Sequence, residues 1–213
     1  MGDQSSIYYT TSSGKRWTKS TMTKQYWAGI ASNADASYMV AIVGPAKQKY
    51  AWVSTDGGAS FSLLANEELC TWGCLGHSRD LSRMIITDVG TLNTHVSTDY
   101  GDTWQQIFCT ECLSYSNFTQ TGWDTCAVSG DGLSYALGFQ GESLKVIHGC
   151  DPRKPGTHGC KDVWTDQLAV STSGVWDTVG LALNYDGTYF YSADASTLVV
   201  TAGRFVEDEE EQE

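Results

Sequence analysis

The chain has 213 residues, a formal net charge of −12 and an aromatic content of 12%. Its 22 glycines and 3 prolines are typical of short strands joined by tight turns, and the sequence lacks the apolar stripe of an amphipathic helix. The sequence has no stripe of basic residues that could neutralise nucleic-acid phosphates, and no apolar run as long as a membrane span. It therefore predicts neither nucleic-acid binding nor a membrane-spanning helix.

The negative charge is concentrated at the C-terminus. Six of the acidic residues lie in residues 207–213, which leaves a charge of about −6 on the remainder of the chain. A short acidic run of this kind is typical of a solvated, disordered end. The sequence therefore predicts one domain over residues 1–206, followed by an acidic disordered tail over residues 207–213.

A first motif recurs along the chain and begins with tryptophan. In three copies an aspartate follows the tryptophan by eight residues, and in the fourth copy by ten. An apolar run follows each aspartate, so each copy predicts a hairpin with aspartate at its turn. The four tryptophans occupy one repeated place, and we interpret them as core residues: Trp27, Trp72, Trp123 and Trp176.

A second motif, an octet, stands between the hairpins and reads Ser-x-Asp-x-Gly-x-Ser/Thr-aromatic. It is intact at residues 54–61 and 97–104, degenerate at 10–17, and largely lost at 150–164. An aspartate can accept hydrogen bonds from turn amides, and glycine can take the positive φ of a tight reversal. The octets therefore predict turns, held by Ser54, Asp56, Gly58, Phe61, Ser97, Asp99, Gly101 and Trp104.

A third strand is predicted before each octet, and a fourth strand after it. These third strands are expected at residues 7–10, 50–53, 93–96 and 144–147, and a fifth, at 197–200, is expected without an octet after it. Each repeat then holds four antiparallel strands in about 45 residues, the size of one propeller blade. The chain begins and ends partway through a repeat.

With both motifs in place, nearly the whole chain resembles the Asp-box repeat proteins, the family of neuraminidase-type (BNR) repeats. The resemblance implies an all-β fold, here a small β-propeller of about four four-stranded blades. We expect the termini to share one blade, with the N-terminal strand sealing the blade begun by Trp176. The alternatives are an open array or an oligomer, with one of the two terminal strands outside that blade.

Seven cysteines suggest an oxidising compartment. The triplet at Asn117 is an N-glycosylation acceptor and agrees with that setting, although no apolar signal segment opens the chain. A Pro- and Gly-containing loop is expected to be closed by a disulfide between Cys150 and Cys160, the alternative being a metal site with His148 and His158. The other cysteines are expected to link neighbouring repeats, for example Cys109 with Cys112 or Cys126, and the odd total leaves one thiol over.

The resemblance includes sialidases, but their three substrate-binding arginines and tyrosine–glutamate pair have no counterpart here. The best carboxylate pair is Asp124 and Asp177, which each follow a repeat tryptophan, and we interpret them as strand caps. The hairpin-turn aspartates offer too few oxygens singly for calcium: Asp35, Asp80, Asp131 and Asp186. We therefore predict no catalytic residue, no cofactor and no metal.

The sequence predicts a non-enzymatic, secreted or surface-associated propeller that is a structural or protein-interaction subunit of a larger assembly. Its expected setting is extracellular or the lumen of the secretory pathway. Its expected partners are other protein subunits, with glycans as a further candidate, in a homo- or hetero-oligomer. The alternatives are a glycan-binding or glycoside-hydrolase-like module of sialidase descent, and an assembly factor resembling those of photosystems.

Overall fold

The computed structural model describes residues 4–44, 50–64, 72–88, 94–107, 125–138, 144–147, 165–167, 178–194 and 199–204. Within these ranges every regular element is a β-strand, and every strand pairing is antiparallel. This part of the chain therefore contains no helix that could cross a membrane.

Four sheets follow one another along the chain. The first contains β3 (Trp27–Ser32), β4 (Met39–Val43), β5 (Ala51–Ser54) and β6 (Ser62–Leu63). The second contains β7 (Trp72–His77), β8 (Met84–Asp88), β9 (Thr94–Ser97) and β10 (Gln105–Ile107). The third contains β11 (Thr125–Val128), β12 (Tyr135–Gly138), β13 (Leu144–Ile147) and β14 (Thr165–Gln167). The fourth contains β15 (Thr178–Leu183), β16 (Tyr189–Asp194) and β17 (Val199–Arg204).

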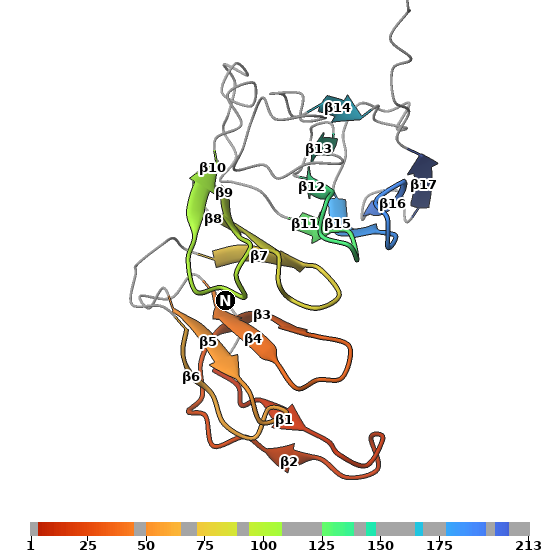
Figure 1. Cartoon of the computed structure of the whole chain (residues 1–213). Coiled ribbons are helices and arrows are strands. Elements are labelled where there is room, and N and C mark those ends of the chain that lie inside the picture. The colour runs from red at the N-terminus through yellow and green to blue at the C-terminus, as the bar shows by residue number, and fades with distance from the viewer. Residues whose placement is uncertain are drawn as a thin grey trace, which may run out of the picture.

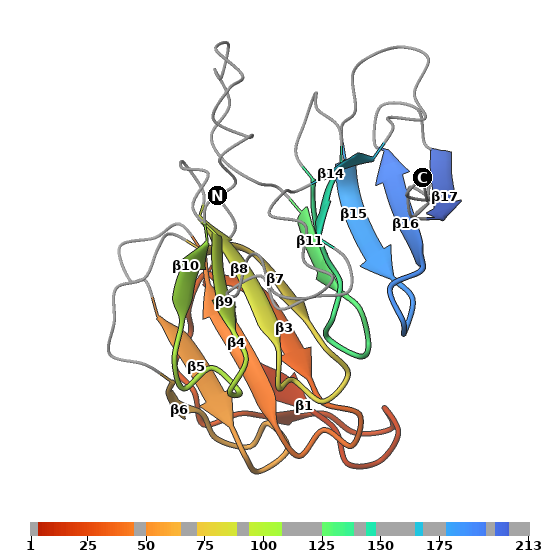
Figure 2. The ribbon, with the colours of Figure 1, turned by 45° about the horizontal axis from the view of Figure 1, so that its top comes forward.

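The sheets are arranged in an arc, with their first strands as neighbours. Strand β3 packs on β7, β7 on β11, and β11 on β15. Figure 1 shows the first and fourth sheets toward opposite ends of this arc, and Figure 2 shows the same succession from a second direction. The meander of each sheet confirms the predicted order of hairpin, third strand and fourth strand in the first three repeats.

The core lies between consecutive sheets. We call the side of a sheet that meets the next sheet its forward face, and the opposite side its backward face. Val40 on the forward face of the first sheet clusters with Met84 of the second. Ile85, one residue later, is on the forward face of the second sheet and clusters with Tyr135 of the third. Strand alternation therefore lets each second strand contribute to two successive cores.

Small residues allow the first strands to approach closely. A Cβ atom added at Gly76 of β7 would lie 3.0 Å from the Cα atom of Ala127 in β11. A side chain here would press on the backbone of the neighbouring sheet, which cannot rotate away as a side chain can. Gly76 therefore sets the spacing between the second and third sheets.

The N-terminal hairpin departs from the predicted arrangement. Strands β1 (Tyr8–Tyr9) and β2 (Thr18–Lys19) pair only with each other among the described strands. The segment is bound to the first sheet instead, where the Thr21 amide donates to the Ala59 carbonyl oxygen at 3.0 Å. The expectation that the N-terminal strand seals the fourth sheet is therefore wrong, because β17 occupies the place beside β16.

One disulfide lies within the described residues and joins Cys74 of β7 to Cys126 of β11, with their Cα atoms 5.8 Å apart. It links two neighbouring sheets, as the prediction for this group of cysteines requires. The suggested bond between Cys109 and Cys126 is wrong, because Cys126 is bonded to Cys74. The predicted bond between Cys150 and Cys160, the acceptor Asn117 and the acidic tail lie outside the described residues.

Candidate functional site

The two intact octets form the same turn, between the third and fourth strands of their sheets. In the first octet the Gly58 amide donates to Ser54 Oγ at 2.9 Å. Asp56 accepts from the Ser60 amide at 2.9 Å through Oδ1 and from the Ser60 hydroxyl at 2.5 Å through Oδ2. Both carboxylate oxygens are therefore used inside the turn. These bonds, led by that of the Ser60 hydroxyl, lower the pKa of Asp56 to about 2.

The second octet repeats these contacts. The Gly101 amide donates to Ser97 Oγ at 2.8 Å, and the Thr103 amide donates to Asp99 Oδ1 at 3.0 Å. The Thr103 hydroxyl donates to Asp99 Oδ2. The aromatic that ends this octet, Trp104, packs against the core between the first and second sheets.

The degenerate octet keeps the same geometry with different donors and acceptors. The Gly14 amide donates to Thr10 Oγ1 at 3.2 Å, and the Arg16 amide donates to Ser12 Oγ at 2.9 Å. A serine hydroxyl thus takes the place that a carboxylate has in the intact octets. Each octet joins two paired antiparallel strands, β1 with β2, β5 with β6 or β9 with β10, so its role in the structure is to close a turn.

The predicted tryptophan core is only partly described. Trp27 is partly buried at the start of β3, and its indole N–H donates to the Ser5 carbonyl oxygen at 3.0 Å. It thereby ties the N-terminal segment to the first sheet. Trp72 begins β7, but its side chain lies outside the described part, as do Trp123 and Trp176.

A second repeated turn joins the first and second strands of every sheet, and we call these four the rim turns. They span residues 33–38, 78–83, 129–134 and 184–189. In each, the side-chain oxygen of the first residue accepts from the amide five residues later, as in Ser78 with Arg83 at 3.0 Å. The equivalent bonds begin at Asn33, Ser129 and Asn184. A local side-chain acceptor therefore fixes every rim turn.

The third residue of each rim turn is an aspartate that accepts through one oxygen. Asp35 Oδ1 accepts from the amide and hydroxyl of Ser37 at 3.0 and 2.6 Å. Asp80 Oδ1 accepts from the Ser82 amide at 3.0 Å, and Asp131 Oδ1 from the Leu133 amide at 2.9 Å. Unlike in the octets, Oδ2 stays outside the hydrogen bonds of the turn.

The fourth residue of each rim turn has a positive φ. The values are 57° at Ala36, 63° at Leu81, 77° at Gly132 and 71° at Gly187. Two of the four turns thus place a residue with a side chain in the left-handed region that favours glycine. The hydrogen bonds accepted by the aspartate and by the first residue of the turn offset the conformational free energy that this backbone geometry costs.

Hydrogen bonds join successive rim turns to one another. The Arg79 amide donates to the Gly130 carbonyl oxygen at 3.0 Å, and the Asp131 amide donates to the Tyr185 carbonyl oxygen at 2.8 Å. The second, third and fourth turns therefore form one continuous surface.

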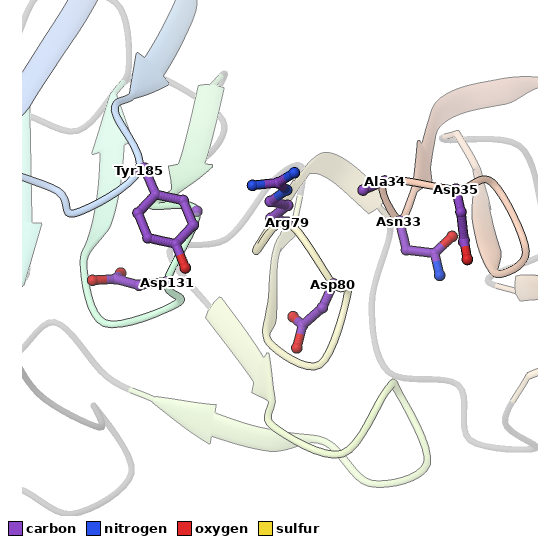
Figure 3. A pocket seen from close by; sticks show the side chains of 8 residues that line it. Asn33, Ala34, Asp35, Arg79, Asp80, Asp131 and Tyr185 are labelled. Carbon is purple, nitrogen blue, oxygen red and sulfur yellow. The ribbon is translucent and has the colours of Figure 1, made fainter.

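A pocket of about 410 Å³ opens on this surface. All four rim turns contribute to it, and its lining consists of Asn33, Ala34, Asp35, Arg79, Asp80, Gly130, Asp131 and Tyr185. Figure 3 shows the Arg79 guanidinium apart from the carboxylates of Asp80 and Asp131.

The net charge of this rim pocket is negative, since its lining contains three carboxylates and one guanidinium. The Ser37 hydroxyl bond is the largest influence on Asp35 and lowers its pKa. Burial alone would raise the pKa of Asp80, but hydrogen bonds from Ser78 and Ser82 outweigh burial and lower it. Both groups are therefore ionised at neutral pH.

The rim pocket was not predicted as a site. Asp35, Asp80 and Asp131 each follow a tryptophan by eight residues, and this common spacing indicates equivalent turns. On sequence alone, each aspartate was considered only by itself, as a calcium ligand. The structure brings these three into one pocket and leaves Asp186 out of its lining. Among the described residues, no group of three or more His, Cys, Asp or Glu side chains is placed to hold a metal ion. The candidate pair Asp124 and Asp177 lies outside the described ranges.

Antiparallel sheets packed face to face in an arc, with their first strands innermost, define the architecture of a β-propeller. No family model and no curated protein sequence matches the chain. Among solved structures, the chain is similar to YCF48 bound to D1 peptide, with a TM-score of 0.62 and 13% identity over 93% of this chain. It is also similar to the β-propeller domain of Cps50 (Swd1) from Myceliophteria thermophila, with a TM-score of 0.56 and 8% identity over 87% of this chain. The chain spans 57% of the length of each.

Proposed function

We propose that the protein is a non-enzymatic interaction propeller whose rim pocket binds an exposed segment of another protein through a lysine or arginine side chain. The observation that carries this proposal is the set of three rim-turn carboxylates in one pocket. In each carboxylate Oδ1 accepts a hydrogen bond from a turn amide, and Oδ2 takes no part in the hydrogen bonds of the turn. Groups that are already held in place lose little conformational entropy on binding. A cationic side chain can then donate charge-assisted hydrogen bonds to these carboxylates.

The form of the partner follows from the shape and charge of the pocket. An opening of about 410 Å³ is of a size for one or two side chains rather than for a folded domain. The net negative lining favours a cation, and Tyr185, which is 62% exposed, offers a ring face for cation–π contact. The similar YCF48 structure holds a peptide, which supports a peptide-like ligand here.

The same carboxylates are poorly suited to catalysis, which supports the absence of an enzymatic role. A general acid at neutral pH needs a pKa near 7, whereas Asp35 and Asp80 have lowered pKa values. Each carboxylate is also tied to the backbone of its own turn. We therefore assign the pocket to binding.

The cellular setting and the repeat family are part of the proposal. The disulfide between Cys74 and Cys126 supports an extracellular or secretory-lumen location, because such bonds persist in oxidising compartments. The matching turns at residues 54–61 and 97–104 support descent from Asp-box repeats. A subunit role in a larger assembly agrees with a binding surface on a rigid scaffold.

Selection from a random peptide library on the immobilised protein tests the proposed ligand class. We expect the bound peptides to be enriched in lysine and arginine. Their affinity should fall roughly tenfold in the variant with Asp80→Asn and Asp131→Asn, equivalent to about 1.4 kcal/mol. Asparagine keeps an Oδ1 that can accept from a turn amide, as Asn33 Oδ1 does from the Tyr38 amide at the first position of its own turn. The substitution therefore removes charge and retains an acceptor for the turn. Asp102→Asn, an exposed aspartate outside the pocket, is the matched control.

A glycan ligand is the second candidate, favoured by the exposed ring of Tyr185 beside Asp131 and Arg79. Sugars stack on such rings, while carboxylates accept hydrogen bonds from the sugar hydroxyls. A glycan array with wild type and Tyr185→Ala separates the two candidates. Specific glycan binding that Tyr185→Ala abolishes, without any selected basic peptide, would replace the protein partner by a glycan.

A further inference from the structure

The second strands of the four sheets have one equivalent position that shows how the sheets associate. Register pairs Val40 with Ala31, Ile85 with Gly76, and Ala136 with Ala127. In the fourth sheet the same pairing joins Tyr191 to Ala182. The first three second-strand residues are fully buried against the next sheet, but Tyr191 is 45% exposed.

Tyr189 lies on the same face as Tyr191 and is 44% exposed. Between them in sequence, Phe190 points to the opposite side and packs with Ala136 of the third sheet. The forward face of the fourth sheet therefore presents two tyrosine rings at the place where a further sheet would pack.

The first sheet has the complementary opening on its backward face. Leu75, in the first strand of the second sheet, packs against the first sheet. Cys126, its equivalent in the third sheet, is 7% exposed. The equivalent residue of the first sheet is Ile30, which pairs with Ala41, and it is 56% exposed. Ala41 is fully buried, whereas Ile30 on the neighbouring strand is open.

These two open faces lie at the two ends of the arc. Figure 1 shows the hairpin of β1 and β2 with the first sheet at one end, and β15, β16 and β17 at the other. The two faces therefore do not cover each other within one chain. Both belong to the interface type that the described sheets already use three times.

We propose that a second copy of this chain covers each open face, so that Tyr189 and Tyr191 of one copy pack over Ile30 of the other. The contact is head-to-tail, because a forward face meets a backward face, and two such contacts close a ring of two copies. It continues an interface already present between neighbouring sheets, with the same residue positions and strand register. The inference does not depend on the ligand proposed for the rim pocket.

The mass in solution tests this arrangement, measured by light scattering during size-exclusion chromatography. Wild type is expected at twice the 23.2 kDa of one chain. Ile30→Asp and Tyr191→Asp should each give monomers, because each variant damages one side of both contacts. Leu133→Asp adds the same charge at an exposed rim-turn residue outside both faces and should stay dimeric. Circular dichroism establishes that each variant is folded.

Mixing the two variants distinguishes head-to-tail packing from other dimers. A mixture of Ile30→Asp with Tyr191→Asp contains one contact with two intact faces, so a species of two chains should return. A dimer that both single variants retain, or a mixture that stays monomeric when each variant is folded, would overturn the proposal. Monomeric wild type at high micromolar concentration would do the same.

Discussion

The aspartates of the octets and of the rim turns differ in how many carboxylate oxygens accept hydrogen bonds within the turn. Asp56 spends both oxygens inside its octet, whereas Asp80 uses Oδ1 alone. An aspartate of the first kind holds a turn, and one of the second kind can hold a turn and meet a ligand. Stability and binding are therefore expected to separate between these two sets of residues.

Asp99→Ala is expected to destabilise the fold. It removes the acceptor of the Thr103 amide and hydroxyl, and loss of such a turn network costs about 1 to 2 kcal/mol. Urea denaturation measures the change, with Asp102→Ala as the control at an exposed neighbour in the same octet. Binding at the rim pocket should be unaffected, and a folded Asp99→Ala protein that no longer bound its peptide would contradict the assignment.

Acidification is expected to destabilise the protein between about pH 4 and pH 2. The pKa of Asp56 is about 2 in the fold and ordinarily 3.8, so the unfolded chain takes up the proton first as pH falls. The stabilisation is thus fully present above pH 3.8 and is lost as pH falls toward 2. Thermal melts across this range should show a smaller pH dependence for Asp56→Asn than for wild type. Equal slopes would show that Asp56 does not carry the effect.

At the scale of elements, the first strands and rim turns position the pocket. The second, third and fourth rim turns hydrogen-bond in succession, and the first strands below them pack through small residues such as Gly76. The spacing of the rim aspartates is therefore set by strand packing and not by their own side chains.

Gly76→Ala is expected to separate the second and third sheets and to destabilise the fold by about 1 to 3 kcal/mol. Its Cβ would lie 2.9 Å from Ile85 Cγ2 and 3.0 Å from Ala127 Cα. Gly29→Ala is the matched control on β3, since its nearest neighbour would be a side-chain atom of Ile42 at 3.3 Å. Chemical denaturation should show the larger loss for Gly76→Ala, and the reverse order would contradict this account of sheet spacing.

The strands were largely predictable from sequence because apolar runs and turn residues are local signals. The run at 38–43 became β4, and that at 84–86 became the start of β8. The rim pocket was not predictable, because it depends on bringing Asp35, Asp80 and Asp131 together from three turns. The intact octets have the longer sequence motif, but they join the third and fourth strands of their sheets and do not line the rim pocket.

At the scale of the whole molecule, tandem sheets are joined by packing and by a covalent link. The order of the sheets followed from the repeats, but the place of the N-terminal hairpin did not. Sequence alone could not decide whether β1 or β17 would pair with β16, because both segments have the pattern that predicts the third strand of a repeat. Likewise, the facing strands that bring Cys74 to Cys126 cannot be identified from residue spacing.

Loss of the disulfide is expected to lower stability by about 2 to 4 kcal/mol, because the bond closes a long loop across 52 residues. Peptide mapping without reduction should recover the linked peptides of Cys74 and Cys126. Thermal denaturation of Cys74→Ser with Cys126→Ser then measures the loss. Quantitative alkylation of both thiols in protein isolated without reductant would contradict the link.

The most direct measurement is titration calorimetry of one selected basic peptide against three proteins: wild type, Asp80→Asn with Asp131→Asn, and Asp99→Ala. The rim variant is expected to keep wild-type stability and to bind roughly tenfold more weakly. Asp99→Ala is expected to lose stability and to keep the wild-type affinity. Unchanged affinity in the rim variant, with loss of binding in folded Asp99→Ala, would place recognition at the octets and contradict the account.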